Sequence, residues 1–387
     1  MKLLVFILSA VLQVFLAAQV AVAQDTAPAF ATKARQAYLM EAKTGTVLLA
    51  VNENQAFPPA SLAKLMTMEV VFSALKRGEI TLEDRFPVTE YAWRKGGAPS
   101  GTTTMFASLK SEVPVSDLIR GVVIQNANDG CIILAEGISG TEAEFAARMT
   151  ARAKDLGLGR STFGNATGLP EAQSFSTARD LVGLARHIHR EYPEYYPLYA
   201  QPDFEWNKIF QRNKNPLLAL NMGVDGLGAG FAEGAGYALV ASIERGGTRL
   251  FLALGGMASD KERLEEARRI LEWGLSSFET KVLFTPGEVV GQASIYGGET
   301  RHVDLVAREP IDIYLPSENP ERLTGRIVYK WPLRAPVAEG QAVGTLRIFA
   351  GERLVREVDL VAAHRVGTGS LVSKATDALL ELMFFWL

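Results

Sequence analysis

The chain has 387 residues, of which 48% are hydrophobic and 21% charged, a composition typical of a globular protein with two or three domains and not of a disordered or fibrous chain. Forty Lys and Arg against 43 Asp and Glu give a net charge of −3, which supplies no general reason to bind nucleic acid. One cysteine, Cys131, cannot form an internal disulfide, and 4 histidines without a Cys/His cluster offer no structural zinc site, so we expect no metal and no cofactor.

The first 23 residues are predicted to form a signal peptide. Lys2 precedes an apolar run over residues 3–18, and Ala-Val-Ala at 21–23 is a small-residue cleavage site before Gln24. Glutamines interrupt the apolar run, and it is shorter than the ~20 residues that span a bilayer, which disfavours the alternative of an uncleaved membrane helix. The mature chain is therefore expected to start near Gln24, outside the cytoplasm.

Residues 24–278 are predicted to form a mixed α and β domain, because helical and strand-like periodicities both occur there. The strand patterns lie at 38–40, 46–51, 237–243 and 249–254, and the helical patterns lie at 62–76, 116–124 and 260–275.

Residues 279–366 show a different pattern, with short alternating runs at 303–306, 311–314, 326–329 and 344–349 separated by proline and glycine turns. This pattern predicts a small all-β domain. Residues 367–387 place apolar side chains three and four apart and end in Phe-Phe-Trp-Leu, which predicts an amphipathic helix. The helix is too short and too charged to span a membrane, so it either lies on a membrane surface or docks on the protein's own core.

The segment 58–64, Pro-Pro-Ala-Ser-Leu-Ala-Lys, is the most informative for chemistry. Two prolines followed by a helical apolar stripe place Ser61 at a helix N-terminus, with Lys64 on the same face of the first turn. A lysine with a lowered pKa can take the proton of a serine nucleophile, and free N–H groups at the helix start can hold an oxyanion. The tetrapeptide alone is weak evidence, since Ser73 and Lys76 repeat it late in the same helix, where we expect an ordinary surface.

Several segments, in order, resemble the D-alanyl-D-alanine carboxypeptidases, the low-molecular-mass penicillin-binding proteins. They are residues 38–45, 60–64, 118–121, 125–129, 165–169, 176–180 and 224–230. The resemblance implies an α+β fold with a penicillin-binding (β-lactamase-like) transpeptidase domain, followed by the all-β domain and a membrane-associating helix. It also implies Ser61 as the nucleophile, Lys64 as its base and Asn128 as a contact for the substrate's amide.

Two family motifs are altered in this sequence. Asn126 stands where the family carries the serine of Ser-x-Asn, so a hydroxyl that relays protons is missing; an amide can hydrogen-bond Lys64 but cannot act as a general acid. Gly228 and Ala229 stand where the family carries the lysine and threonine of Lys-Thr-Gly, which supply a positive charge and a partner for the substrate carboxylate. Gly230 is retained and permits close backbone approach on an edge strand.

Arg249 is the candidate that we expect to replace the lost carboxylate partner, because an arginine can hold a carboxylate through two hydrogen bonds. An exposed strand cation without a function is an equally good interpretation of the same residue. Lys208, Arg212 and Lys214 lie nearby in sequence, but nothing in the sequence favours one of them over a solvated loop. His187 and His189 are expected to be structural, since no serine or acidic motif accompanies them.

The resemblance implies a serine carboxypeptidase that removes the terminal D-alanine of peptidoglycan stem peptides through a Ser61 acyl-enzyme. Its implied partners are those stem peptides, β-lactams as covalent inhibitors, and the inner membrane surface, which the C-terminal helix contacts from the periplasm. The altered motifs leave open an enzyme of reduced activity and, as the alternative, a degraded relative that binds peptidoglycan as a scaffold. A β-lactamase shares the Ser-x-x-Lys chemistry but does not explain the C-terminal β domain.

Overall fold

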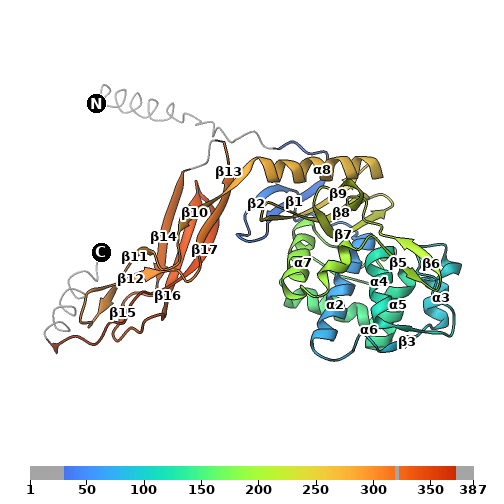
Figure 1. The fold of residues 1–387 in the computed structure, drawn as a ribbon, viewed down its shortest axis with the longest axis horizontal. Helices are drawn as coiled ribbons and strands as arrows, with labels where there is room; N and C mark the ends of the chain where they lie inside the picture. Colours follow the sequence, from blue (N-terminus) through green and yellow to red (C-terminus); the bar gives the residue numbers. More distant parts are fainter. Residues whose placement is uncertain (1–29, 319–321, 372–387) are drawn as a thin grey trace, which may run out of the picture. The chain divides into compact units, whose positions relative to one another are not determined.

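The computed structural model describes residues 30–318 and 322–371 (Figure 1). The predicted signal peptide at 1–23 and most of the predicted C-terminal helix, from 372 onward, lie outside the described residues. Every strand and helix pattern predicted between residues 38 and 349 corresponds to a strand or helix of the structure. At the start of the predicted C-terminal helix, however, residues 367–370 are not helical, because Thr368 forms an antiparallel bridge with Gly298.

The N-terminal domain is built on a five-stranded antiparallel sheet with the order β2-β1-β9-β8-β7. Its strands are β1 (Gln36–Glu41), β2 (Val47–Val51), β7 (Val224–Ala232), β8 (Gly236–Arg245) and β9 (Thr248–Met257). Strand β1 pairs with β9 and so joins the first two strands to the last three, because the chain returns to this sheet after the helical region. Strand β7 forms an edge of the sheet.

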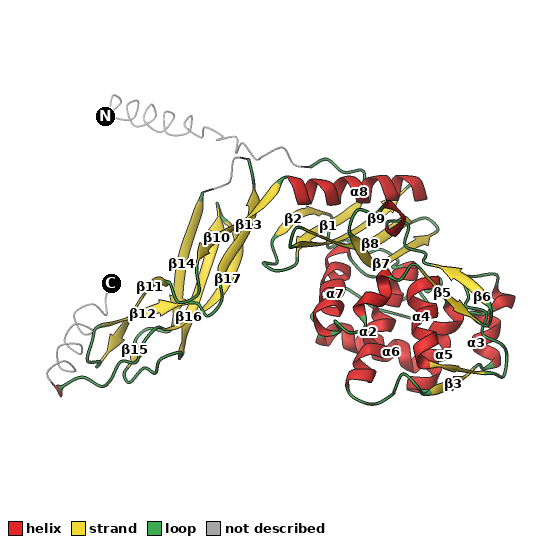
Figure 2. Ribbon diagram, viewed as in Figure 1, coloured by secondary structure: helices red, strands yellow, loops and turns green. Residues whose placement is uncertain are grey.

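Alternating side chains of β1 and β9 serve the two faces of the sheet, as the two-residue period of a strand requires. Leu39 and Leu250 face helix α8 (Asp260–Ser276), where a Cβ atom on Gly274 would lie 2.7 and 2.8 Å from their methyl carbons. Met40 and Phe251, which are register partners, belong to the core shared with the other helices. Figure 2 shows α8 on one side of the sheet and the remaining helices on the other.

The helical part surrounds α2, whose residues 63–74 are all buried, as expected for a helix that is packed on every side. The surrounding helices are α3 (Glu90–Lys95), α4 (Val115–Gln125), α5 (Asn128–Ser139), α6 (Glu142–Asp155) and α7 (Ala178–Glu191). Two small antiparallel strand pairs, β3 (Arg85–Pro87) with β4 (Glu112–Pro114) and β5 (Asp203–Trp206) with β6 (Ile209–Arg212), border them. The fixed position of α2 determines where its N-terminal turn meets the sheet.

The C-terminal domain is all β, as the sequence predicts, and has its own hydrophobic core. A pair of strands, β10 (Phe278–Phe284) and β13 (Ile311–Pro316), accompanies a six-stranded sheet with the order β14-β16-β17-β12-β11-β15. The strands of that sheet are β11 (Val289–Tyr296), β12 (His302–Val306), β14 (Leu323–Tyr329), β15 (Leu333–Arg334), β16 (Ala342–Ala350) and β17 (Arg353–Ala362).

Within residues 30–318 and 322–371, none of the helices has the length and apolar character needed to cross a bilayer. The same residues contain no group of three or more His, Cys, Asp or Glu side chains placed to hold a metal ion.

Candidate active site

Ser61 lies in a 3₁₀ turn, η1 (Ala60–Leu62), that continues directly into α2 (Ala63–Lys76). The turn follows Pro59, and Ala60 has a φ of +47°, an uncommon conformation for a residue with a side chain. The backbone N–H groups of a first helical turn have no acceptor inside the helix. In this turn the Leu62 N–H donates to the Pro59 carbonyl and the Ala63 N–H to the Ala60 carbonyl. Ser61 therefore sits at a helix N-terminus, as the sequence predicts, and its own backbone N–H has no hydrogen-bond partner among the described residues.

Lys64 is 5% exposed, and its Nζ lies 3.3 Å from Ser61 Oγ and 2.7 Å from the carbonyl oxygen of Thr167. Burial lowers the pKa of Lys64 from 10.5 to about 8. A substantial fraction of this amine is therefore neutral near pH 8 and can accept the proton of Ser61.

The loop 165–169 supplies the carbonyl that holds Lys64. Asn165 Oδ1 accepts hydrogen bonds from the backbone N–H groups of Thr167 and Gly168 and fixes the turn. Gly168 has a φ of +76°, and a Cβ atom there would lie only 1.7 Å from the carbonyl oxygen of Ala60. Only glycine fits at this contact. The loop 165–169, one of the segments that resemble the family, therefore holds Lys64 in position.

Asn126 caps the C-terminus of α4 with a φ of +63°, a left-handed conformation that asparagine tolerates better than most residues. Its side chain lines a cleft together with Ser61 and Lys64. The hydrogen bonds of Lys64 go to Ser61 and Thr167, so the bond that an amide at position 126 can make to Lys64 is not formed. Among the described residues the Asn126 amide has no hydrogen-bond partner, which leaves it available to a ligand.

Asn128 is the first residue of α5, is 5% exposed and is not among the residues that line the cleft, although Asn126 and Ala127 connect it directly to the lining. Its Nδ2 donates to Thr102 Oγ1 at 3.0 Å, while its Oδ1 has no hydrogen-bond partner among the described residues. The next residue, Asp129, has a structural role because its carboxylate accepts hydrogen bonds from Thr104 and from the backbone N–H groups of Met105 and Ala107.

Strand β7 forms the facing side of the cleft. Gly228 and Ala229 line the cleft, and a Cβ atom on Gly228 would meet no atom within 4 Å. Gly230 makes the expected close approach, since a Cβ atom there would lie 3.2 Å from the Pro59 carbonyl oxygen and 3.3 Å from the Ser61 nitrogen. The altered motif thus occupies the position facing Ser61 but contributes neither a charge nor a hydroxyl.

Arg249 is not among the residues that line the cleft. Its Nη1 lies 2.7 Å from a carboxylate oxygen of Asp225 and donates to Ser242 Oγ, and its Nη2 pairs with Glu244. The guanidinium is therefore already neutralised within the sheet. We do not retain Arg249 as the partner of a substrate carboxylate.

Lys214, Asn215 and Tyr199 also line this cleft. Lys214 was one of three nearby cations in the sequence, together with Lys208 and Arg212. Only the fold distinguishes Lys214, because Lys208 and Arg212 are not among the residues that line the cleft. Nothing in the sequence marked Tyr199, which comes from the 3₁₀ turn η3 (Tyr196–Ala200). None of the residues that line the cleft is acidic.

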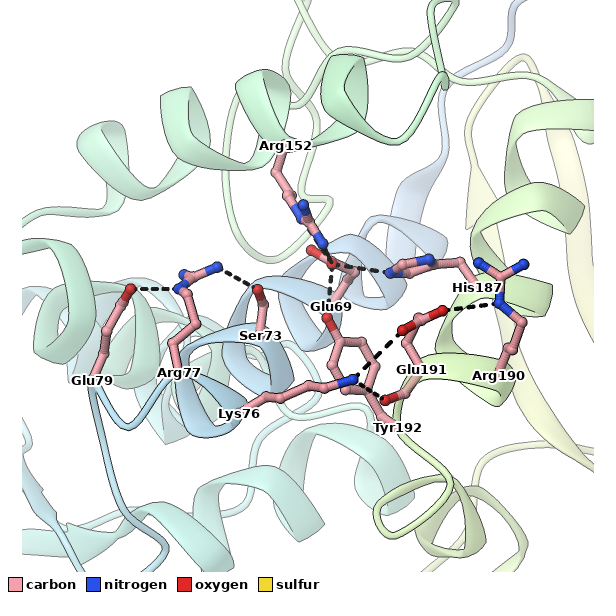
Figure 3. Close-up of polar contacts among 10 residues, drawn as sticks. All are labelled: Glu69, Ser73, Lys76, Arg77, Glu79, Arg152, His187, Arg190, Glu191 and Tyr192. Carbon is pink, nitrogen blue, oxygen red and sulfur yellow. Dashed lines mark hydrogen bonds and ion pairs between the residues drawn. The ribbon is translucent and has the colours of Figure 1, made fainter. Parts of the chain in front are cut away.

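The second Ser-x-x-Lys copy does not form a serine–lysine pair (Figure 3). Ser73 Oγ accepts a hydrogen bond from Arg77, and Lys76 Nζ lies 3.5 Å from Glu191. Ser73 is buried rather than exposed, but its hydroxyl is used in a structural contact.

The buried carboxylate of Glu69 organises the same region of α2. Arg152 and Tyr192 donate to its Oε1 at 2.9 and 3.0 Å, and His187 Nε2 lies 3.3 Å away (Figure 3). Burial alone would raise the pKa of Glu69, but these donors hold it below its usual value. His189 packs edge-on against the ring of Tyr196. Both histidines therefore have the structural surroundings that the sequence predicts.

A serine in contact with a buried lysine at the start of a helix, facing the edge strand of an antiparallel sheet, defines a serine hydrolase site of the penicillin-binding type. Residues 20–257 match the family of D-alanyl-D-alanine carboxypeptidases, and residues 278–368 match the C-terminal domain of penicillin-binding protein 5. The chain belongs to the D-alanyl-D-alanine carboxypeptidase family.

Two relatives are similar over most of their length. The D-alanyl-D-alanine carboxypeptidase DacC of Escherichia coli is 35% identical over 367 residues, which cover 94% of this chain and 92% of that protein. The D-alanyl-D-alanine carboxypeptidase DacD of Salmonella typhimurium is 36% identical over 342 residues, 88% of each chain.

Solved structures show the same fold. Penicillin-binding protein 5 of Haemophilus influenzae has a TM-score of 0.77 and 34% identity, covering 87% of this chain and 98% of that chain. Penicillin-binding protein D2 of Listeria monocytogenes, in an ampicillin-bound form, has a TM-score of 0.56 and 27% identity, covering 64% of this chain and 100% of that chain.

Proposed function

We propose that this family member is a serine-type D-alanyl-D-alanine carboxypeptidase that removes the terminal D-alanine of peptidoglycan stem peptides through an acyl-enzyme at Ser61. The observation that carries the proposal is the 3.3 Å contact between Ser61 Oγ and the buried Lys64 Nζ in a cleft. Its relatives with this name and their similarity over most of the chain support the same activity.

In the acylation step, neutral Lys64 takes the proton of Ser61 while Oγ attacks the carbonyl carbon of the penultimate D-alanine. The backbone N–H of Ser61, at the start of the helix, stabilises the oxyanion. The C–N bond then breaks, and the protonated Lys64 returns its proton to the departing amine. Because Asn126 cannot act as an acid, the proton has no serine relay and passes directly from Lys64.

In deacylation, a water molecule attacks the ester carbon and gives its proton to Lys64, which returns it to Ser61 Oγ as the ester bond breaks. The peptide is positioned by the backbone of the edge strand β7, and Asn128 Oδ1, a buried acceptor without a partner among the described residues, receives an amide N–H of the substrate.

Covalent labelling by penicillin tests the nucleophile. We expect a mass increase of one penicillin on the mature chain, located at Ser61 and absent in Ser61→Ala. Ser73→Ala is the matched control, because it changes the serine of the second Ser-x-x-Lys copy and should leave the adduct intact. A protein that forms no adduct and releases no D-alanine from a pentapeptide after long incubation would favour the scaffold alternative.

The proposed location is the periplasm, with peripheral attachment to the inner membrane through the C-terminal helix. Gly369 N–H donates to the Gly297 carbonyl, so a truncation after Leu371 preserves this contact of the β domain. We expect the truncated mature chain to leave the membrane fraction while keeping its penicillin labelling. Equal membrane association of the truncated and full-length mature chains would contradict this anchoring.

A further inference from the structure

One end of the C-terminal β domain, from which the chain continues into residues 372–387, carries exposed aromatic and basic side chains. We propose that this end, centred on Trp331, Lys330 and Arg334, binds the anionic lipid surface of the membrane as a second contact in addition to the C-terminal helix. The inference deepens the proposed peripheral attachment and rests on it, because it takes a bilayer surface to lie within reach of this end.

Backbone pairing assembles this end from segments that are distant in sequence. Strand β15 pairs with the end of β11, where Arg334 lies opposite Tyr296 (Figure 1). The last described segment joins the same end, because Thr368 forms an antiparallel bridge with Gly298. The chain therefore leaves the β domain beside β11 and β15, so a surface that residues 372–387 bind lies close to these strands.

Trp331 is the large apolar side chain of this end. It is 59% exposed and lies two residues before β15. An indole ring combines a large apolar surface with a polar N–H group, which is why tryptophan is enriched where lipid headgroups meet acyl chains. Arg334 and Tyr296 place a second aromatic ring beside a cation, with 6.0 Å between the guanidinium carbon and the ring centroid. These side chains fit a membrane interface better than they fit bulk water.

The charge of the same end favours an anionic surface. Its segments 296–301, 330–340 and 364–370 contain four Lys or Arg residues and two carboxylates, a positive excess in a chain whose net charge is −3. The four cations are all exposed, and none of them forms an ion pair with a described residue; they are Arg301, Lys330, Arg334 and Arg365. Each cation held near an anionic lipid surface strengthens binding by about fivefold.

Residues 372–387 do not supply this attraction themselves. Their charged side chains are Lys374, Asp377 and Glu381, one cation against two carboxylates. Binding of an amphipathic segment to a membrane depends on its buried apolar area and on electrostatic attraction to anionic lipids. The predicted helix therefore provides the apolar part, and the basic end of the β domain provides the electrostatic part.

Vesicle binding by the full-length mature chain tests the electrostatic part. Sedimentation is measured with vesicles of phosphatidylcholine and with vesicles in which about a third of the lipid is anionic phosphatidylglycerol. We expect Lys330→Gln with Arg334→Gln to weaken binding to the anionic vesicles by about tenfold and to leave binding to phosphatidylcholine unchanged.

Arg322→Gln with Arg326→Gln is the matched control. It removes the same charge from the start and middle of β14, and Arg326 lies over the ring of Phe349 as Arg334 lies over that of Tyr296. This control should bind both kinds of vesicle like the wild type. Penicillin labelling and thermal unfolding of every variant verify that its two domains are folded.

Fluorescence tests whether Trp331 itself enters the lipid. The difference between the emission of the wild type and of Trp331→Phe isolates Trp331 from the other tryptophans, and we expect brominated lipids in anionic vesicles to quench it. Trp331→Ala should weaken binding to both kinds of vesicle several-fold, because the indole area is no longer buried. Leu354→Ala is the control, since Leu354 is 45% exposed near the start of β17, at the opposite end of that strand from segment 364–370.

Two results would overturn the proposal: Trp331 emission that is not quenched on vesicles that bind the wild type, or a charge variant that binds anionic vesicles like the wild type. A protein partner on this end, or residues 372–387 packed over Trp331, would give these results. A full-length chain that binds no vesicles would instead overturn the proposed attachment on which the inference rests. The carboxypeptidase proposal is tested separately, because it depends on the penicillin adduct at Ser61.

Discussion

The two sides of the cleft differ in how much of the family's chemistry they keep. On the helix side, Ser61 and Lys64 are in contact, and the Thr167 carbonyl fixes the lysine. On the strand side, Gly228 and Ala229 line the same cleft without a functional group. In the proposed mechanism the helix side is the proton-transfer half, which keeps its serine and lysine, whereas the strand side, the substrate-binding half, has lost the lysine and threonine of the family motif.

This difference shows that the two halves depend on different physical effects. Burial alone lowers the pKa of Lys64 to about 8, so the base does not require a neighbouring cation to be partly neutral near that pH. Binding of a substrate carboxylate does require a donor or a charge at a defined position. We therefore expect the loss of the strand lysine to weaken substrate binding more than it impairs the activation of Ser61 as a nucleophile.

The largest effect is expected from removal of the base. Lys64→Met should lower the rate of penicillin acylation by about 10³-fold, within the range of general-base contributions, because Ser61 then has no proton acceptor. Stopped-flow or quench measurements of adduct formation give the rate, with Lys76→Met as the control from the second Ser-x-x-Lys copy. If Lys64→Met acylates at more than a tenth of the wild-type rate, the helix side is not the proton-transfer half.

Restoring the strand motif tests the substrate-binding half. Gly228→Lys with Ala229→Thr should raise D-alanine release from a pentapeptide by at least ~10-fold, because the position of Gly228 has room for a side chain and charge-assisted contacts return. Asn126→Ser should add to the effect by providing a proton relay.

Gly159→Lys is a suitable control, since Gly159 also has open space around it and lies outside the cleft lining. Circular dichroism verifies folding before rates are compared. A folded double mutant no faster than the wild type would show that the substrate carboxylate is already fully served by other donors.

The pH dependence sharpens the same comparison. Acylation requires neutral Lys64, so its rate should rise about tenfold per pH unit below pH 8 and level off above about pH 9. The Gly228→Lys change adds a cation and should move this rise to lower pH. Penicillin acylation rates measured between pH 6 and pH 10 provide the test, and a rate independent of pH in this range would exclude Lys64 as the base.

The smallest effect on turnover is expected from Arg249→Met. Because Arg249 pairs with Asp225 and Glu244 outside the cleft lining, D-alanine release should change by less than about twofold. The thermal midpoint should fall, since two carboxylates lose their partner within the sheet. A tenfold rise in KM with unchanged stability would instead return Arg249 to the substrate site.

The sequence by itself determined the parts of the site that depend on local structure. Prolines before an apolar helical stripe placed Ser61 at a helix start and Lys64 on the same face, since residues three apart are neighbours on any helix. The retained Gly230 likewise indicated a close backbone contact, because glycine is the residue that permits one. The alternating runs after residue 278 identified the β domain for the same local reason.

Only the tertiary structure decided which distant side chains share the cleft. In the sequence, Arg249 and Lys214 were both candidates for a cation in the cleft. Contacts with other segments decide where each of them lies. Strand register pairs Arg249 with Glu244, while the bond from Lys214 to Ile124 attaches Lys214 beside Asn126. The same holds for Lys64, whose pKa is lowered by burial under elements far away in the chain. Such contacts depend on how the sheet and helices pack, a long-range arrangement that the residue pattern of one segment does not contain.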